Sequence, residues 1–301
     1  MYSWSTLLNE SKQKITSKNP NGGVVYLLGK KTEYIQRLSE KTGRNTILYF
    51  AAFMHKPKNH EVEINDKDIN AFMENVHGLD KKKGLDLILH SPGGNLAATE
   101  QIIYYLNSYF NNDIRAIVPQ MAMSAASLIS VSCKSILMGR QSCIGPFDPI
   151  LNGVQCQAVL REFKKAIADV EQHPASLGLW QTIISQLNPT FITLCEQADK
   201  LSEELTEKIL SNKGLDNEAK KVIRNVFGTN EHSKTHSRHI DRTRCKNAGL
   251  DIVDLEQDQE IQDLVLGIHH CCMILGEQSN IVKIVENNVG GCYQLHENNK
   301  I

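Results

Sequence analysis

The chain has 301 residues, of which 41% are hydrophobic and 22% are charged, so it can bury a sizeable core and is not expected to be disordered. Its 33 basic and 34 acidic side chains give a net charge of −1, which offers no electrostatic reason to expect a nucleic acid or an anionic membrane as partner. No uncharged apolar stretch of about 18 residues occurs, so we expect no membrane span.

Short apolar runs alternate with helical patterns through the first half of the chain. The predicted strands cover residues 46–53, 85–89, 114–118 and 135–138, and the predicted helices cover residues 69–76, 96–110 and 124–133. This repeated order of strand, turn and helix predicts an α/β domain with parallel crossovers.

The remaining segments divide the chain into four parts. Residues 1–30 are polar, contain a turn cluster at 19–23, and are expected to form a loosely packed N-terminal arm or an interface segment. Residues 31–153 are the expected core, and residues 154–228 show helical periodicity without a strand. Residues 229–301 are expected to return to the core with a helix at 241–248, a strand at 250–255, a helix at 257–275 and a strand at 281–285.

Two turns, each between a predicted strand and a predicted helix, are candidates for chemistry. The first is Ser91-Pro92-Gly93-Gly94, whose adjacent glycines allow backbone N–H groups to point outward. Such groups at a helix start can hold a phosphate or the oxyanion of acyl transfer, or the segment is an ordinary turn. No GxxxxGK[ST] or GxGxxG pattern is present, which disfavours a nucleotide-binding fold.

The second turn contains Ser124, which follows the 114–118 strand and has the alanines Ala122, Ala125 and Ala126 close by in the sequence. A serine at a helix N-terminus lies at the positive end of the helix dipole, which favours a developing negative charge. The structural alternative is a serine that caps the helix, because Ser127, Ser130 and Ser132 occur in the same segment.

These motifs occur in an order that resembles a known family. The SPGG turn after an LDLIL strand, the AMSAAS segment about 30 residues later and MGRQSCIGPFDP are similar to Clp-type and signal-peptide-peptidase-like serine peptidases. The resemblance is closest to the serine dehydrogenase proteinase family, and it extends over residues 47–293. It implies an α/β fold, a ClpP/crotonase-like ββα superhelix with an added helical arm at residues 154–228.

The resemblance also implies an activity, which is hydrolysis of polypeptide amide bonds without a cofactor or metal. Ser124 is then the nucleophile, and N–H groups of Gly93, Gly94 and Ala125 are the expected oxyanion donors. Removing one donor of this kind typically costs about 2.7–4 kcal/mol of transition-state stabilisation. The superhelix usually assembles through its helical arm, so we expect a homo-oligomer.

A serine hydroxyl also needs a general base. Clp peptidases place a histidine about 25 residues after the serine, but no histidine occurs here between Ser124 and Gln172. Lys200 and His236 both match positions of the resembled family, and we rank Lys200 slightly above His236. Lys164 and Lys165 are a third option.

Cysteines and histidines give no strong metal pattern. The eight cysteines lack CxxC spacing and the N-terminus lacks the pattern of a secretory signal, so we expect reduced, mostly buried thiols in a cytoplasmic protein. The candidate metal group comprises His232, His236, His239, His269, His270 and Cys271, and its spacing does not favour zinc. His269 and His270 are expected to pack on their helix.

Asp148 lies between two prolines, where we expect it to shape a specificity pocket or cap the following helix. Two other functions are compatible with the pattern. One is a crotonase-like enzyme acting on an acyl-thioester, which shares the fold and the paired N–H device. The other is a scaffold that has lost its base.

Overall fold

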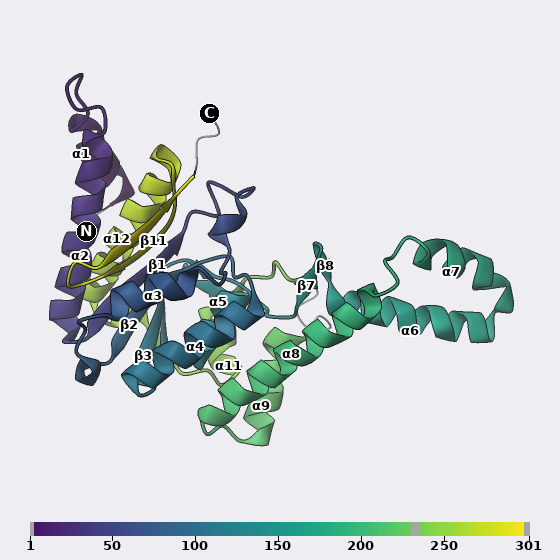
Figure 1. Cartoon of the computed structure of the whole chain (residues 1–301). Helices are drawn as coiled ribbons and strands as arrows, with labels where there is room; N and C mark the ends of the chain where they lie inside the picture. The colour runs from purple at the N-terminus through teal and green to yellow at the C-terminus, as the bar shows by residue number, and fades with distance from the viewer. Residues whose placement is uncertain (1–2, 230–234, 298–301) are drawn as a thin grey trace. The chain divides into compact units, whose positions relative to one another are not determined.

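The computed structural model describes residues 3–229 and 235–297 (Figure 1). The chain forms two compact units, one made of Met1–Gly145 with His239–Ile301 and the other of Pro146–Arg238. The first unit carries both turns that the sequence analysis identified, and the second carries Lys200 and His236.

A seven-stranded sheet in the order β10-β5-β3-β2-β1-β11-β12 forms the centre of the first unit. Its strands are β1 (Asn45–Ala51), β2 (Leu85–His90), β3 (Ile114–Val118), β5 (Ser135–Met138), β10 (Ile252–Asp254), β11 (Ile281–Asn287) and β12 (Cys292–His296). Neighbours from β10 to β1 run parallel, whereas β11 is antiparallel to β1 and β12. Every residue of β1 and β2 is buried, as the apolar runs of central parallel strands require. The predicted α/β class is confirmed.

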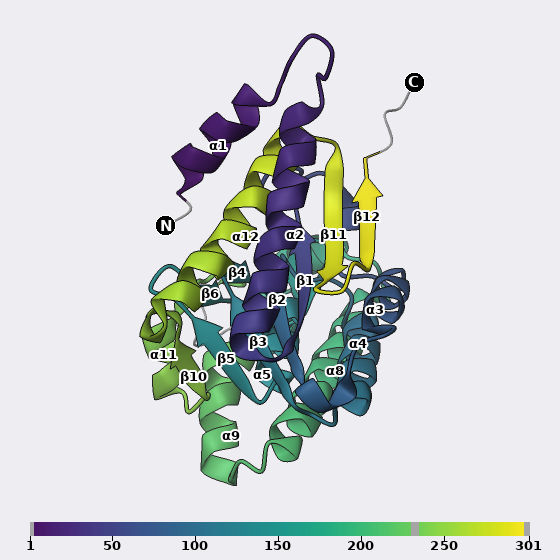
Figure 2. The ribbon, with the colours of Figure 1, turned by 90° about the vertical axis from the view of Figure 1, so that its left-hand side faces the viewer.

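Helices cover both faces of this sheet (Figure 2). They are α1 (Trp4–Gln13), α2 (Gly22–Thr42), α3 (Asp68–Val76), α4 (Leu96–Phe110), α5 (Ala125–Ser132) and α12 (Gln259–Gln278). On one face α2 and α12 lie side by side, and α1 packs against both. On the other face α3 packs on β11 and β12, α5 packs on β3 and β5, and α4 contacts both helices.

The first 30 residues correct one prediction. Instead of a loosely packed arm, they form α1 and the start of α2, and Leu7 and Leu27 are buried in the main core cluster. Trp4, Leu7 and Leu8 follow the i, i+3, i+4 spacing of an apolar helix face. The polar composition of the segment hides this narrow apolar stripe, which is sufficient to attach the helix to α2 and α12.

A smaller three-stranded sheet lies beside the carboxyl ends of the parallel strands. It contains β4 (Met121–Ala122), β6 (Cys143–Ile144) and β9 (Ile240–Asp241) in the order β4-β6-β9. Because β4 also bridges to Ser91, just after β2, this sheet connects the end of β2 to the segment that follows β3. The short helix α11 (Arg242–Asn247) follows β9.

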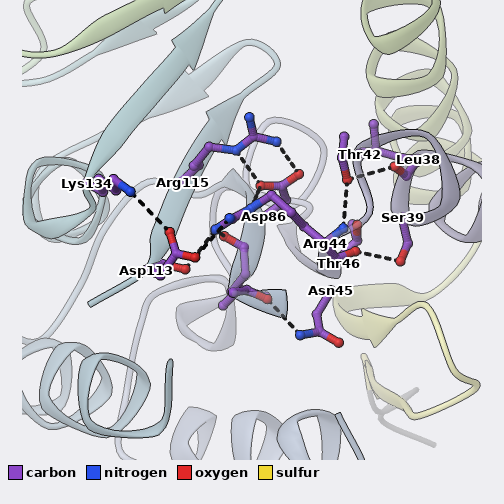
Figure 3. Close-up of polar contacts among 12 residues, drawn as sticks. Leu38, Ser39, Thr42, Arg44, Asn45, Thr46, Asp86, Asp113, Arg115 and Lys134 are labelled. Atoms are coloured by element: carbon purple, nitrogen blue, oxygen red, sulfur yellow. Dashed lines mark hydrogen bonds and ion pairs between the residues drawn. The ribbon is translucent and has the colours of Figure 1, made fainter. Parts of the chain in front are cut away.

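A charge cluster fixes the register of the parallel strands at their amino ends (Figure 3). Asp86 on β2 is fully buried and accepts hydrogen bonds from Arg115 Nε and Nη2, both at 2.7 Å, and from Arg44 Nε at 2.9 Å. Arg115 is the register partner of Asp86 on β3. Arg44 also bonds Asp113, at 3.0 Å, just before β3. The cluster therefore aligns β2 with β3, whose opposite ends lead to the two candidate turns.

The second unit is mainly helical. It contains β7 (Ile150–Leu151), β8 (Val154–Gln155), α6 (Cys156–Gln172), α7 (Leu177–Ile184), α8 (Phe191–Asn212) and α9 (Asn217–Ile223). Cys156, Phe191 and Cys195 form its small core between α6 and α8. Residues 154–228 were predicted to contain helices only, but β8 pairs with β7 in a hairpin at the start of this segment.

None of the helices in the described part of the chain combines the length and the apolar character that a membrane crossing requires.

Candidate active site

Ser124 occupies a strained turn between β4 and α5. Its backbone has φ 53° and ψ −122°, which lies outside the regions favoured by residues with a Cβ. Such a conformation costs about 1–3 kcal/mol and persists only where the surrounding structure imposes it. In α/β-hydrolases a strained strand-to-helix turn presents the oxygen of a nucleophilic serine. Here the side chain is half-buried at the start of α5.

The hydroxyl of Ser124 differs from those of the neighbouring serines. Ser127, Ser130 and Ser132 each donate to a backbone carbonyl, at 2.8, 2.9 and 2.7 Å. Ser124 makes no side-chain capping bond to α5, and its hydroxyl has no hydrogen-bond partner among the described residues of this unit. Ser124 therefore occupies the N-cap position of α5 without capping the helix through its hydroxyl, which is free within the described part of this unit.

The Ser91–Gly94 turn packs directly against Ser124. Ser91 pairs with Ala122 in a parallel bridge, in which Ser91 N–H donates to Met121 O at 3.2 Å and Met123 N–H donates to Ser91 O at 2.9 Å. A Cβ added to Gly93 would lie 2.7 Å from Ser124 Cβ and 2.8 Å from the nitrogen of Ala125. The structure thus brings together the four residues Gly93, Gly94, Ser124 and Ala125.

The N–H groups of these turns are not equivalent. The N–H of Gly93 donates to Ser91 Oγ at 3.2 Å, so it is already engaged. The N–H groups of Gly94 and Ala125 donate to no acceptor among the described residues of this unit. Ala125 begins α5, where the first N–H groups have no intrahelical acceptor. Gly94 and Ala125 therefore each carry a backbone N–H group that is free within this unit as far as the structure describes it.

Lys200 lies on α8 in the second unit with its side chain 77% exposed. Its Nζ is 3.8 Å from Glu204 Oε1, one turn along the same helix. A surface pair of this kind is weak and leaves the ammonium hydrated. The side chain thus lacks the burial by which proteins convert a lysine into a general base.

His236 forms a pair with a buried carboxylate within the second unit. Its Nδ1 lies 3.1 Å from Asp148 Oδ1, the Asp148 side chain is fully buried, and the His236 side chain is 17% exposed. Asp148 Oδ2 accepts a further bond from Gln155 Nε2 at 2.9 Å. Asp148 does not cap α6, since Gln155 is the residue at that cap. The pairing of Asp148 with His236 was not predicted, because the two residues are 88 positions apart.

Two buried histidines pack behind the turns of the first unit. His90 ends β2 directly before Ser91, stacks on Phe50 with ring centroids 5.4 Å apart, and has no partner for either ring nitrogen among the described residues. The ring centroid of His269, on α12, lies 4.9 Å from that of His90, and His269 Nε2 donates to Gln120 Oε1 at 3.0 Å. Burial lowers the pKa of His90 to about 3 and lowers the pKa of His269 well below its ordinary value. Both rings are therefore neutral near neutral pH.

No metal-ligand cluster is found within residues 3–229 and 235–297, where no three His, Cys, Asp or Glu side chains gather as a ligand set. His232, one of the histidines considered in the sequence analysis, lies outside the described residues. Seven of the eight cysteines are buried and Cys292 is exposed, in agreement with the prediction of mostly buried thiols.

Comparison with known proteins identifies a family that this chain matches. A family model described as ClpP-like SDH-type serine proteinase matches residues 19–277. The chain is 27% identical over 202 residues to the uncharacterized protein MJ0137 of Methanocaldococcus jannaschii, covering 67% of this chain and 64% of the relative. It is 26% identical over 168 residues to the uncharacterized protein MJ1495 of the same organism, covering 56% and 51%. The chain thus spans less than two thirds of the length of either relative.

Proposed function

Because the chain belongs to the family of ClpP-like SDH-type serine proteinases, we propose that it hydrolyses amide bonds of polypeptides through an acyl-enzyme on Ser124. The observation that supports this most strongly is the strained Ser124, whose hydroxyl has no partner within its unit and whose backbone packs against Gly93. A half-buried serine held in a costly conformation without a structural bond fits a nucleophile better than it fits a structural role.

The proposed reaction uses the backbone of both turns. Ser124 Oγ loses its proton to a base and attacks the carbonyl carbon, so that the carbonyl oxygen becomes an oxyanion. The N–H groups of Gly94 and Ala125 stabilise that oxyanion. Collapse of the intermediate expels the amine, which takes the proton from the base, and water then hydrolyses the ester. Gly93 contributes space rather than a donor, because its N–H is bonded to Ser91.

We propose His236 as the base, with Asp148 as the group that orients it. Asp148 accepts from His236 Nδ1, which leaves Nε2 as the nitrogen that can accept a proton. This assignment reverses the order of the sequence analysis, in which Lys200 came first. The support is that the imidazole has a buried partner, whereas Lys200 is mostly in water.

The test is the rate of labelling by a fluorophosphonate probe. We expect Ser124→Ala to abolish labelling and His236→Ala to slow it by about 10²–10⁴-fold, the usual contribution of a general base. Asp148→Asn should slow it as well, because an amide at this position can hold the ring in the wrong tautomer. Lys200→Ala should label like the wild type and serves as the control.

Three outcomes would contradict parts of the proposal. Normal labelling of Ser124→Ala removes the nucleophile, and slow labelling of Lys200→Ala beside normal labelling of His236→Ala restores Lys200 as the base. Binding of an acyl-CoA by a protein that the probe does not label supports the crotonase-like alternative instead.

We also propose that the protein is a cytoplasmic homo-oligomer that assembles through residues 154–228. Supporting features are the eight free cysteines, which suit a reducing compartment, and the exposed apolar side chains Ile167, Leu179 and Ile183 on α6 and α7. Ile167→Glu and Leu179→Glu should reduce the mass measured by light scattering after size exclusion. An unchanged mass in both variants would place the contact elsewhere.

A further inference from the structure

The Gly93-Gly94 turn lies along the segment at residues 63–65. Ile64 N–H donates to Gly93 O and Asn95 N–H donates to Ile64 O, both at 2.8 Å. This parallel bridge pairs Ile64 with Gly94, and a Cβ on Gly94 would run into the backbone of Ile64. In a parallel bridge the residue between the two bonded groups directs its own N–H to the opposite side. The position of Ile64 therefore sets the direction of the Gly94 N–H.

A buried ion pair holds this segment on both sides of Ile64. Lys283 on β11 donates to the carbonyl of Glu63 at 3.0 Å, and the N–H of Asn65 donates to Asp68 Oδ2 at 3.0 Å. Lys283 Nζ and Asp68 are joined at 2.7 and 2.9 Å to the two carboxylate oxygens. The three N–H donors of Lys283 are thus matched by two carboxylate oxygens and one carbonyl.

Tyr49 completes the arrangement from β1. Its hydroxyl donates to Asp68 Oδ2 at 2.8 Å, and its ring stacks on Phe72 with centroids 5.7 Å apart. Lys283 and Asp68 are 1% and 2% exposed, and burial lowers the pKa of Lys283. A buried ion pair is often no more stabilising than apolar residues of the same size. Here the pair orients the 63–65 segment, because Lys283 bonds the carbonyl of Glu63 and Asp68 bonds the N–H of Asn65.

We propose that Asp68 and Lys283, with Tyr49, are positioning residues that hold the Gly94 N–H toward the oxyanion. The inference rests on the proposed function and deepens it, since it assigns a role to groups that contact no substrate. A displacement of about 1 Å at a catalytic group can lower a rate by about 10²-fold. Loosening the 63–65 segment should therefore lower the rate of acylation without removing any reacting atom.

A second buried ion pair that also includes a residue of β11 provides a matched control. Lys31 and Glu286 form this pair between α2 and β11, with side chains 0% and 4% exposed, and Thr32 Oγ1 also donates to Glu286 at 2.5 Å. The described bonds of this pair do not include the 63–65 segment or the Ser91–Gly94 turn. Lys31→Met therefore removes a buried charge of similar exposure without touching the proposed path to Gly94.

The experiment compares Asp68→Asn, Lys283→Met, Tyr49→Phe and Lys31→Met in the full-length protein. Fluorophosphonate labelling and hydrolysis of a peptide ester are measured beside urea unfolding and the ¹⁵N-glycine spectrum. We expect Asp68→Asn and Lys283→Met to lower kcat by about 10-fold or more with little change in KM, and to shift the amide signal of Gly94. Lys31→Met should lose similar stability while keeping its kcat and the Gly94 signal.

Tyr49→Phe keeps the inference testable if the charge variants do not fold, because it retains the stacked ring and removes one bond to Asp68. We expect it to lower kcat by about threefold or more. The positioning role is overturned if Ser124 is labelled and the Asp68, Lys283 and Tyr49 variants all keep wild-type rates while being as stable to urea as Lys31→Met. If Ser124→Ala retains the activity, the proposed function itself has failed.

Discussion

Gly93→Ala tests the contact between the two turns. Gly93 has φ +94°, a conformation that costs a residue with a Cβ about 1–2 kcal/mol. Its Cβ would also lie 2.6 Å from Met123 O, 2.7 Å from Ser124 Cβ and 2.8 Å from Ala125 N. Two of these three atoms belong to the backbone, so the methyl group can be accommodated only if one turn moves away from the other.

The expected loss follows from the donors on either side of this contact. Separation of the turns moves Gly94 and Ala125 away from a common oxyanion position, and losing one such donor costs about 2.7–4 kcal/mol, or about 10²–10³ in rate. We therefore expect Gly93→Ala to slow fluorophosphonate labelling by about 10²-fold or more. Labelling time courses at several probe concentrations, beside urea unfolding curves, measure both effects.

Gly249→Ala is the matched control. Gly249 has φ +90° and an added Cβ would meet nothing within 4 Å, so it has the same backbone cost without the contact. Both substitutions also reduce the entropy of the unfolded chain in the same way. Gly249→Ala should keep the wild-type labelling rate. Equal labelling rates in the two variants would refute the claim that the turns form one site.

Three further predictions concern stability and are measured by urea unfolding. The pKa of His90 is about 3 in the folded chain and about 6.5 in the unfolded chain. Between these pH values the unfolded state binds more protons, so the free energy of unfolding falls as the pH drops below about 6.5. The loss should reach about 2 kcal/mol near pH 5 and shrink in His90→Leu, and a loss that is unchanged in this variant would contradict the assignment. Arg115→Ala leaves the buried Asp86 with one arginine partner and should cost about 3–5 kcal/mol, whereas a cost under about 1 kcal/mol would show that Asp86 does not need Arg115. Ser127→Ala removes one of the two acceptors of Gly145 N–H, which also donates to Ala122 O at 3.2 Å. It should cost about 0.5–1.5 kcal/mol while Ser124 still reacts, and loss of the reaction would show that Ser127 also shapes the site.

The central α/β elements could be predicted from the sequence because their signals are local. The bounds of β3, β5 and α4 agree with the predicted ranges 114–118, 135–138 and 96–110. Apart from Arg115 in β3 and Ser135 in β5, the residues of these strands are apolar. The helix begins where Asn95 Oδ1 accepts from Ala98 N–H and ends where Asn111 takes a left-handed conformation.

Elements that depend on distant partners were missed. The strands β4, β6 and β9 have two residues each, which is too short for any periodicity, and they exist because the ends of β2 and β3 are brought together. The edge strand β12 is mostly half-exposed and lacks a clear alternation. The apolar stripe of α2 is interrupted by lysines, one of which, Lys31, is buried only because Glu286 pairs with it.

The candidate site was predicted only in part. Sequence and resemblance placed Gly93, Gly94, Ser124 and Ala125 together, and in the structure Gly93 lies against Ser124 and Ala125. Which N–H groups are free could not be predicted, because the bond from Gly93 to Ser91 Oγ is a matter of local geometry. The pairing of His236 with Asp148 likewise depends on tertiary structure.

The most direct test of the account is a crystal structure of the protein with a peptide boronic acid, whose boron bonds a nucleophilic serine as a tetrahedral adduct. The account predicts boron bonded to Ser124 Oγ, with one boronate oxygen about 2.7–3.1 Å from the nitrogens of both Gly94 and Ala125. An adduct on another residue, or a boronate at Ser124 whose oxygens reach neither nitrogen, would contradict it.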